Sequence, residues 1–401
     1  MIDFPYIGDI CRPTGSKIVM LVVDGLGGLP HPETGRSELE SARLPNLDTL
    51  AQRSAAGLTT PVAPGIAPGS GPGHTALFGY DPVKYLMGRG VLEALGLGVE
   101  LRDGDVAVRC NFCTMDESGL IVDRRAGRIP TEESRPLVEE LSRIEVPGAR
   151  LSVHQGRDYR FVIVLSGEGL GTNVCETDPS VTGGAPLEPA ALSDDSRVTA
   201  RALSVFAGEA RKRLAGRATA NMVLLRGFAK LPDWPRMDDV YRLRPAAIAA
   251  YPMYRGLATL LGMEVLPTGD TFDDELDTLE RSFEDHDFFF LHYKPADAAG
   301  EDGDFGAKVA ALEELDAGIP RLLSLGADTL VVAGDHSTPA IMASHSWHPV
   351  PLLVNSRLTA GDGVPAFTER GCATGSIGRI PATSVMMLAM ANAGKLVRFG
   401  P

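Results

Sequence analysis

Three apolar segments, each ending on ionisable residues, constrain the fold of this chain more than any other feature. They cover residues 17–23, 286–293 and 328–336 and are rich in valine, leucine and phenylalanine. An apolar run without alternation is typical of a strand that is buried on both faces of a parallel sheet. The sequence therefore predicts an α/β core, in which a mostly parallel sheet is flanked by helices.

Candidate metal ligands follow these three predicted strands. The ionisable residues at or shortly after the strand ends are Asp24, Asp297, Glu301, Asp335, His336 and His345. Each one alone is explained equally well as a helix cap or a solvated side chain. Because the carboxyl ends of parallel strands meet at one edge of a sheet, we expect the six to lie together. Four clustered carboxylates repel one another, whereas two divalent ions would be held by this set with the hydroxyl of Ser70.

Ser70 lies in a glycine- and proline-rich stretch, residues 67–82. Glycine and proline disfavour regular structure before Thr75, where a helix can begin, so we expect Ser70 just before a helix N-terminus. Free N–H groups and the helix dipole favour a phosphoryl group there. A surface loop is the alternative. Together with two metals, the serine indicates phosphoryl transfer through a phosphoserine.

Composition excludes several classes of partner. The formal net charge is −14, from 38 Lys and Arg against 52 Asp and Glu residues, which argues against a nucleic-acid partner. No apolar run approaches the roughly 18 residues that span a membrane, and the first residues lack the regions of a signal peptide. We therefore expect a cytoplasmic protein without a membrane partner. The sequence leaves the oligomeric state open.

The five cysteines fit reduced thiols in a large cytosolic protein. Cys110 and Cys113 have the spacing of a metal-binding pair, but no second pair accompanies them. They lie in a predicted strand, residues 106–115, where positions three apart point to opposite faces. We interpret their spacing as a coincidence.

A change of pattern near residue 105 indicates an inserted module. Short alternating strands are predicted at 106–115, 119–123, 149–154 and 160–166, helices near 131–143 and 197–214, and a long loop at 171–195. The α/β pattern returns near Tyr251. We therefore expect a discontinuous core, residues 1–104 and 251–401, that is interrupted by a smaller α+β domain, residues 105–250.

Several motifs along the chain carry a resemblance to a known family. They are Asp24-Gly-Leu-Gly, Pro68-Gly-Ser70, Gly73-His74, Phe78-Gly-Tyr-Asp-Pro82, Gly88-Arg-Gly90, Arg109-Cys-Asn-Phe, Asp123-Arg-Arg-Ala-Gly-Arg128, Asp302-Gly-Asp-Phe305, Gly334-Asp-His-Ser-Thr-Pro339, His345 and Pro349-Val-Pro351. As a set they resemble the cofactor-independent phosphoglycerate mutases of the shorter, archaeal-type class, within the alkaline phosphatase superfamily. The resemblance runs nearly end to end and implies an alkaline-phosphatase-like core.

The resemblance implies an isomerase of glycolysis and gluconeogenesis that interconverts 3- and 2-phosphoglycerate without 2,3-bisphosphoglycerate. Ser70 would be the nucleophile that carries the phosphoryl group. One metal would be bound by Asp24, Ser70, Asp335 and His336, and the other by Asp297, Glu301 and His345. Lys294 would help to neutralise the transferring phosphate. The metal would be Mn²⁺, with Mg²⁺, Zn²⁺ or Co²⁺ as alternatives.

Two departures from the family pattern affect this expectation. Glu301 stands where many relatives have a histidine; glutamate can ligate at this i, i+4 spacing and favours Mn²⁺ or Mg²⁺ over zinc. Ser70 is followed by Gly-Pro-Gly-His, which is similar to the longer class of these enzymes.

The inserted domain would be a substrate-binding lid, because guanidinium groups grip carboxylate and phosphate bidentately. The expected substrate-binding residues are His74, Arg109, Asn111, Arg124, Arg125, Arg128, His154 and Arg157. Asp123 is a candidate general acid/base. A solvated basic face is the alternative for any single arginine. Rival functions are a related phosphotransferase or phosphatase for another small phosphorylated hydroxy acid, and a non-catalytic binding protein of the same fold.

Overall fold

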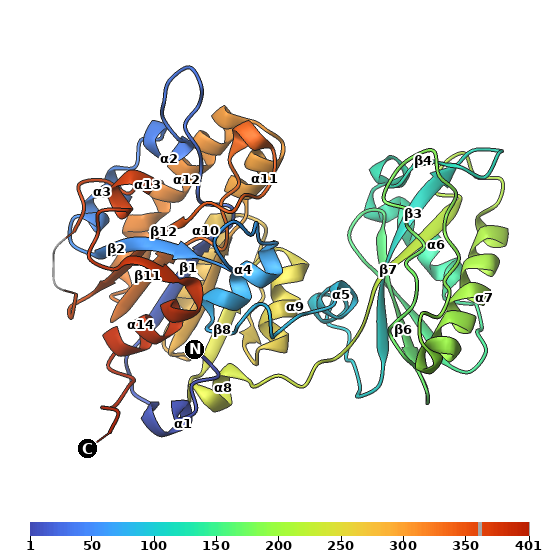
Figure 1. Cartoon of the computed structure of the whole chain (residues 1–401), viewed down its shortest axis with the longest axis horizontal. Coiled ribbons are helices and arrows are strands. Elements are labelled where there is room, and N and C mark those ends of the chain that lie inside the picture. The colour runs from blue at the N-terminus through green and yellow to red at the C-terminus, as the bar shows by residue number, and fades with distance from the viewer. Residues whose placement is uncertain (360–362, 401) are drawn as a thin grey trace. The chain divides into compact units, whose positions relative to one another are not determined.

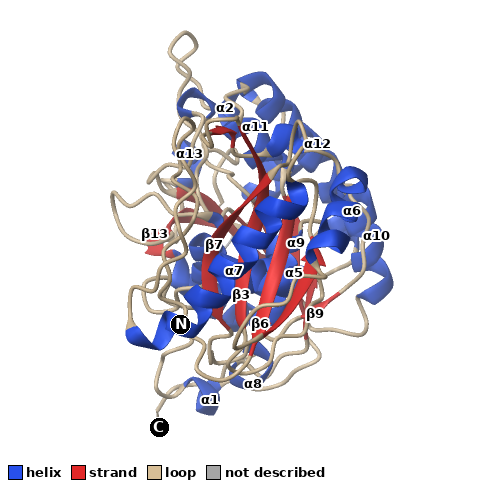
Figure 2. Ribbon diagram, turned by 90° about the vertical axis from the view of Figure 1, so that its right-hand side faces the viewer, coloured by secondary structure: helices blue, strands red, loops and turns tan. Residues whose placement is uncertain are grey.

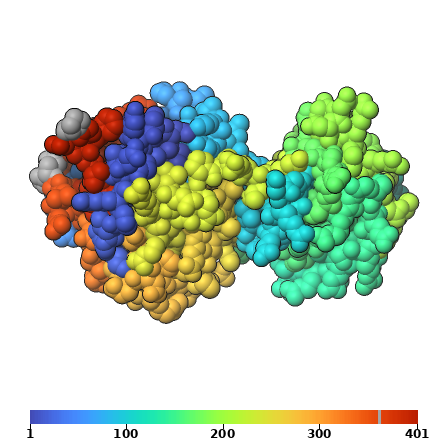
Figure 3. All heavy atoms as spheres, turned by 90° about the horizontal axis from the view of Figure 1, so that it is seen from below, coloured from blue at the N-terminus to red at the C-terminus, as the bar shows by residue number. Residues whose placement is uncertain are grey.

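The computed structural model describes residues 1–359 and 363–400. The chain divides into two compact units: a first unit, Met1–Leu86 with Trp234–Pro401, and a second unit, Met87–Asp233. Figure 3 shows the blue and red ends of the chain together in the first unit and the green middle in the second.

The boundaries of the second unit lie earlier in the chain than the sequence predicted at both ends. Residues 87–104 belong to the insertion because α5 (Arg89–Gly96) packs its apolar side on strands of the second unit. Residues 234–250 belong to the core because β8 (Pro245–Ile248) pairs with β10 (Phe288–Tyr293).

Within the described residues, an eight-stranded sheet forms the centre of the first unit. In order across the sheet its strands are β13 (Gly378–Pro381), β2 (Ala55–Thr60), β12 (Val350–Ser356), β11 (Thr329–Ala333), β1 (Ile18–Val23), β10, β8 and β9 (Glu264–Val265). β12 is antiparallel to both of its neighbours, and every other pairing is parallel. The prediction of an α/β fold with a mostly parallel sheet is confirmed.

Helices cover both faces of this sheet (Figure 1). The helices of the first unit are α1 (Ile7–Ile10), α2 (Glu38–Ser41), α3 (Pro45–Ala51), α4 (Ser70–Leu77), α8 (Met237–Val240), α9 (Pro252–Leu260), α10 (Phe272–Ser282), α11 (Pro295–Glu301), α12 (Phe305–Ser324), α13 (Glu369–Cys372) and α14 (Val385–Asn392), with the 3₁₀ turns η3 (Ala340–Met342) and η4 (Ala382–Ser384). Val19, Leu21 and Val23 of β1 share one apolar cluster with residues of α3, α10 and α12. On the other face, Phe78 at the end of α4 contacts Phe288 and Phe290 of β10.

The direction of β12 explains how His345 reaches the ligand edge. β11 ends at Ala333 on that edge, and β12 begins at Val350 beside it, because the two strands are antiparallel. The connection from 334 to 349 therefore stays at one edge of the sheet.

The second unit contains an antiparallel five-stranded sheet. Its elements are α5, β3 (Val106–Met115), β4 (Ile121–Asp123), η1 (Ala126–Arg128), α6 (Thr131–Leu141), β5 (Arg150–Gln155), β6 (Arg160–Ser166), η2 (Asp194–Ser196), α7 (Arg197–Leu214) and β7 (Met222–Lys230). β3 pairs with both β6 and β7 (Figure 2). Cys110 packs in the cluster with α6 and α7, whereas Cys113 belongs to a separate cluster, as expected for opposite faces of β3.

The helix that carries Ser70 differs from the prediction. α4 begins at Ser70 and includes Gly71-Pro72-Gly73, whereas the sequence predicted a loop up to Thr75. Proline is compatible with the first turn of a helix, where its missing N–H has no partner to lose. None of the helices in the described ranges is sufficiently long and apolar to cross a bilayer.

Candidate functional site

The ends of β1, β10 and β11 bring the predicted ligands together at one edge of the first unit. Asp24 follows β1, Asp297 lies in the first turn of α11 after β10, and Asp335 and His336 follow β11. In the described part of the chain, two groups of side chains could each hold a metal ion: Asp24 with Asp335 and His336, and Asp297 with His336 and His345. His336 belongs to both groups, whereas the sequence assigned it to one.

The first group converges on Nε2 of His336. This nitrogen lies 3.3 Å from Asp24 Oδ1 and 3.1 Å from Asp335 Oδ2, and all three side chains are completely buried. Ser70 Oγ lies 3.1 Å from the same nitrogen. Oxygens of the nucleophile candidate and of two carboxylate ligand candidates therefore lie within 3.3 Å of one ring nitrogen.

The second group lies on the other side of the His336 ring. His345 stacks on this ring with 3.7 Å between the centroids, and its Nε2 lies 3.5 Å from Asp297 Oδ1. The Thr338 hydroxyl donates to the same Asp297 oxygen at 2.7 Å. Glu301 Oε1 lies 3.4 Å from His345 Nε2, but its side chain is 55% exposed and belongs to neither group. The place of Glu301 in the ligand set therefore stays a prediction.

The chemistry of these side chains fits a divalent ion. Asp24 Oδ1 and Asp335 Oδ2 are buried, and neither accepts a well-aligned hydrogen bond from a described residue, although Nε2 of His336 and, for Asp335, Nδ1 of His74 lie within ion-pair distance. Buried carboxylate oxygens that are incompletely satisfied are costly, whereas ligation would satisfy them. Carboxylate oxygens and imidazole nitrogens suit Mn²⁺ and Zn²⁺.

Close packing holds α4 against the end of β11. A Cβ on Gly73 would lie 2.3 Å from the carbonyl oxygen of Asp335, so only glycine allows this approach. His74 is fully buried, and its Nδ1 lies 2.8 Å from the Ser70 carbonyl oxygen and 3.0 Å from Asp335 Oδ2. His74 thus connects the serine to a candidate ligand. The expected contact of His74 with substrate stays a prediction.

Asp24 has three further partners, of which the sequence identified only Lys294. The hydroxyl of Tyr254, Nε2 of His292 at 3.2 Å and Nζ of Lys294 at 3.1 Å all donate to Asp24 Oδ2. Burial opposes ionisation of Asp24, but the hydrogen bond from His292 and the charge of Lys294 hold the pKa of this carboxyl well below its ordinary value. Burial lowers the pKa of His292 to about 4, so the imidazole is a neutral donor.

Lys294 also contacts the second group. Its Nζ lies 2.5 Å from Asp297 Oδ2, so one ammonium group joins a carboxylate of each group. These two carboxylates raise its pKa against the effect of burial, which keeps the side chain charged.

In the second unit, several predicted substrate-binding residues share one face of the sheet. The strand pairings place His154, Val162, Arg109 and Arg226 in one row across β5, β6, β3 and β7, and Asn111 opposite Arg160 in the next. The opposite face of β3 is apolar and packs on α6 and α7. Arg160 and Arg226 were not predicted as site residues. Arg160 opens the predicted strand 160–166, but β7, which carries Arg226, was not predicted, and only the strand pairing places the two arginines beside Asn111 and Arg109.

The Asp123 motif is held by its own hydrogen bonds. Arg124 makes a bidentate contact to the buried Asp178 at 2.9 and 2.8 Å, and Arg226 reaches the same carboxylate at 3.0 Å. Asp123 accepts from the backbone N–H groups of Arg125 and Gly127 at 2.7 and 2.6 Å. The structure thus shows Asp123 as the cap of a turn; its acid/base role stays a prediction. The remaining predicted arginines, Arg125, Arg128 and Arg157, are exposed.

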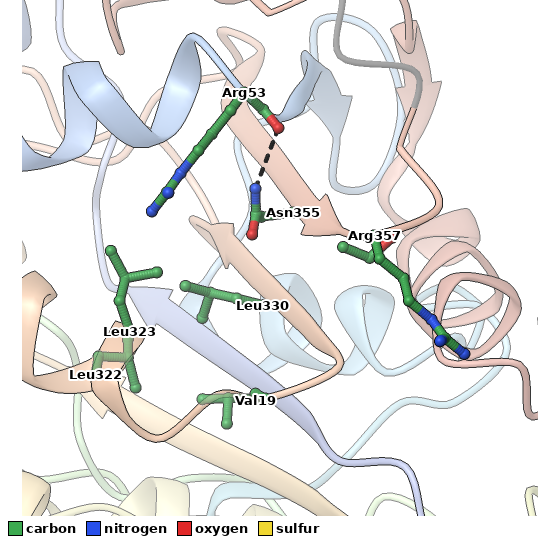
Figure 4. Close-up of a pocket in the computed structure, with 9 residues that line it drawn as sticks. Val19, Arg53, Leu322, Leu323, Leu330, Asn355 and Arg357 are labelled. Carbon is green, nitrogen blue, oxygen red and sulfur yellow. Dashed lines mark hydrogen bonds between the residues drawn. The ribbon is translucent and has the colours of Figure 1, made fainter.

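A separate cavity of about 350 Å³ lies at the opposite edge of the first sheet. Val19 and Leu330, near the starts of β1 and β11, form its apolar floor, and Arg53 and Arg357 lie at its rim. Figure 4 shows the two arginine side chains extending in different directions. Their charges do not converge, and this cavity is remote from the ligand edge.

Comparisons with known proteins agree with this geometry. Residues 51–219 match the family model described as 2,3-bisphosphoglycerate-independent phosphoglycerate mutase. Relatives named "Probable 2,3-bisphosphoglycerate-independent phosphoglycerate mutase" include proteins of Thermus thermophilus, 49% identical over 99% of both chains, and Thermotoga maritima, 47% identical over 98% of both.

Two solved structures are also similar. A protein of Pyrococcus horikoshii is 28% identical with a TM-score of 0.83, covering 97% of this chain and 100% of that one. The cofactor-independent phosphoglycerate mutase of Thermoplasma acidophilum is 31% identical with a TM-score of 0.72, covering 94% and 100%. Because the identity reaches 49% over nearly the whole chain and the fold is shared, the chain belongs to the 2,3-bisphosphoglycerate-independent phosphoglycerate mutase family.

Proposed function

We propose that this chain interconverts 3-phosphoglycerate and 2-phosphoglycerate through a phosphoserine at Ser70, in glycolysis and gluconeogenesis. The observation that carries the proposal is the position of Ser70 Oγ, 3.1 Å from the His336 nitrogen on which buried oxygens of Asp24 and Asp335 converge. Family membership supports phosphoglycerate as the substrate.

Two divalent ions, Mn²⁺ in preference to Mg²⁺, Zn²⁺ or Co²⁺, would be held by the two groups that share His336. When bound, they would supply charge neutralisation and a lower pKa for the serine hydroxyl. Glu301 would add an oxygen ligand beside His345, from which it lies 3.4 Å. A set rich in carboxylates suits Mn²⁺ better than a set rich in thiolates or imidazoles does.

We propose that the reaction runs in two phosphoryl transfers. Ser70 Oγ loses its proton and attacks phosphorus, the bond from phosphorus to the glycerate oxygen breaks, and that oxygen takes up a proton. The other hydroxyl of the bound glycerate then loses a proton and attacks the phosphoserine, the bond from phosphorus to Ser70 Oγ breaks, and Ser70 takes up a proton. Lys294, which contacts Asp24 and Asp297, would place positive charge beside the transferring group. His74 would hold the start of α4 in place throughout.

The second unit would retain glycerate between the two transfers, because a phosphoserine open to water is hydrolysed. Arg109, Asn111, His154, Arg160 and Arg226 share one sheet face and would supply donors for carboxylate and hydroxyl groups. Asp123, Arg124, Arg125, Arg128 and Arg157 would add to this substrate set. Their charge suits an anionic substrate in a chain whose net charge is −14.

We also infer a reducing compartment, the cytoplasm, as the place of action. All five cysteines are free thiols in the structure. Free cysteines in a chain of this size are typical of proteins kept under reducing conditions.

The test is an exchange assay with 3-phosphoglycerate in the absence of 2,3-bisphosphoglycerate, after chelation and after addition of single metals. We expect 2-phosphoglycerate to form with Mn²⁺, and mass spectrometry of a quenched reaction to find phosphate on the peptide that contains Ser70. Hydrolysis of phosphate esters without exchange of phosphoglycerates would instead identify a related phosphatase or phosphotransferase. The absence of both activities would contradict the proposal.

A further inference from the structure

Lys308 is a completely buried lysine in the first turn of α12, behind the ligand edge. Its ammonium group donates to three backbone carbonyl oxygens: Gly25 at 2.9 Å, Gly27 at 2.9 Å and Thr338 at 2.8 Å. No described carboxylate lies within ion-pair distance of it. All three N–H groups of this ammonium are therefore used to hold main chain.

The three carbonyls belong to the two segments that carry ligands of the first group. Gly25 and Gly27 directly follow Asp24, and Thr338 comes two residues after His336. The Thr338 hydroxyl contacts Asp297 Oδ1 at 2.7 Å and His336 Nδ1 at 2.9 Å. Lys308 thus joins the backbone that follows β1 to the backbone that follows β11, and Thr338 contacts Asp297 after β10.

Two glutamates, Glu38, which is buried, and Glu369, which is partly buried, hold the amide groups of the same segments. Glu38 accepts from Leu29 at 3.2 Å and from Ala340 at 2.7 Å. Glu369 accepts from Gly28 at 2.8 Å and from the Ser37 hydroxyl. Lys308, Glu38 and Glu369 therefore fix carbonyls and amides of both segments, and their opposite charges compensate at longer range.

The segments approach each other too closely for side chains between them. Gly25 has a φ of +67°, and a Cβ there would lie 2.7 Å from Thr338 Oγ1 and 2.8 Å from the Asp297 Cα. A small displacement of either segment would thus move Asp24 relative to Asp297 and His336. The spacing of the ligands depends on what holds the two segments together.

We propose that Lys308, with Glu38 and Glu369, is a positioning cluster that sets the spacing of Asp24, Asp297, Asp335 and His336 and thereby raises the affinity of the site for divalent metal. Lys308 contacts no ligand side chain and acts through the backbone. The inference rests on the proposed function only in that the ligand edge binds metal. Groups that orient metal ligands typically change metal affinity 10- to 100-fold when they are replaced.

A purely structural role predicts a different result. Loss of Lys308 would then lower stability, because three buried carbonyls would lose their donor, but the ligand spacing would survive in the folded protein. Lys395 is the matched control. It is equally buried, and it donates to the Thr14 carbonyl at 3.1 Å and to Asp287 at 3.3 Å. Asp287 directly precedes β10, at the end of the strand that is remote from the ligand candidates.

The experiment compares Lys308→Met with Lys395→Met in the full chain. Melting temperature is measured in chelator, and Mn²⁺ affinity is measured by titration calorimetry or by the electron paramagnetic resonance signal of free Mn²⁺. We expect both variants to melt earlier than the parent protein. Lys308→Met should bind Mn²⁺ at least about 10-fold more weakly, whereas Lys395→Met should stay within about twofold. Unchanged Mn²⁺ affinity in folded Lys308→Met, or an equal loss in both variants, would overturn the proposal.

A second pair of variants applies if Lys308→Met does not fold. Glu369→Met removes the acceptor of the Gly28 amide and the partner of the Ser37 hydroxyl, and the control Glu275→Met removes a buried glutamate that accepts from the Ala250 amide at 3.1 Å. Weaker Mn²⁺ binding in Glu369→Met alone would support the positioning cluster, and equal binding in both would overturn it. The parent protein separates the two proposals: Mn²⁺ binding without phosphoglycerate exchange would contradict the proposed function and leave the cluster testable.

Discussion

Ser70 Oγ lies 3.1 Å from Nε2 of His336, although 266 positions separate the two residues in the sequence. The contact joins the start of α4 to the end of β11 and places a hydroxyl where buried carboxylate oxygens converge.

Replacing Ser70 with alanine should abolish phosphoglycerate exchange. The variant loses the atom that would accept the phosphoryl group, so we expect the exchange rate to fall by at least about 10³-fold. Ser54→Ala is the control, because Ser54 is a buried serine that donates to the Leu50 carbonyl away from the ligand edge. An Ser70→Ala enzyme with parental activity would exclude Ser70 as the nucleophile.

Gly73→Ala should lower the melting temperature and the activity together. The new Cβ would lie 2.3 Å from the Asp335 carbonyl oxygen, and relieving this overlap must move α4 away from the ligands. Overpacking of this kind costs about 1–3 kcal/mol of the free energy of unfolding. Gly69→Ala, at the residue before α4, has no such overlap, since the nearest atom to its Cβ would lie 3.9 Å away, and we expect near-parental thermal unfolding and kinetics. Equal effects of the two substitutions would refute the packing argument.

Arg226→Met should weaken the retention of substrate without removing the phosphoserine chemistry. Losing a charge-assisted hydrogen bond to an anion should raise the KM for 3-phosphoglycerate by about 10-fold or more. Hydrolysis of p-nitrophenyl phosphate, a substrate without carboxylate, should persist. Arg213→Met is the control: Arg213 pairs with Glu140 at 2.8 Å in the same unit, on α7. If both variants kept the parental KM, the polar face of this sheet would have no part in binding.

Glu301→Ala should weaken binding of one of two Mn²⁺ ions. Glu301 lies beside His345, which belongs to the second group only, so the affinity of the first group should be unchanged. We expect about a 10-fold loss at one site in a calorimetric titration. Asp302→Ala removes a neighbouring exposed carboxylate and serves as control. Two unaltered Mn²⁺ affinities in Glu301→Ala would remove this residue from the ligand set.

Glu275→Gln should stabilise the protein at neutral and alkaline pH. Burial raises the pKa of Glu275 to about 8, although the Ala250 amide opposes this shift. Because the folded state keeps the proton that the unfolded state releases near its lower, ordinary pKa, the stability contribution of Glu275 falls as pH rises from about 4.5 to about 8. The glutamine variant should lack this decline. Melting curves recorded at several pH values between about 5 and 9 would reveal the difference. Parallel curves for both proteins would contradict the assignment.

The sequence predicted the part of the fold that depends on local apolar pattern. β1, β10 and β11 lie where unbroken apolar runs predicted buried strands, and the acids that follow them meet at one edge because the strands are parallel. β2 and β8 were not recognised, since Ala55–Thr60 and Pro245–Ile248 are short and contain small residues rather than an apolar run. Their burial comes from neighbouring strands and not from their own composition.

Contacts between distant segments explain what the sequence could not predict at the site. His292 and Tyr254 appear in the sequence as a strand residue and a helix residue, and only the fold brings both to Asp24. Lys308 did leave a signal, because it continues the buried side of α12 formed by Leu312, Leu315 and Ile319. A lysine in such a stripe indicates a buried ammonium group, but its three carbonyl partners depend on the tertiary structure.

The second unit occupies one uninterrupted stretch of the gene product, Met87–Asp233, while all six carboxylate and imidazole candidates lie outside it. If the second unit binds the substrate, as we propose, phosphoryl chemistry and substrate choice are encoded in separate segments of the sequence. Exchange of one contiguous segment between relatives, by recombination in nature or by grafting in the laboratory, would then change which hydroxy acid is bound and leave the proposed metal ligands untouched. The architecture is therefore suited to the evolution of new phosphate-ester specificities from a fixed reactive centre.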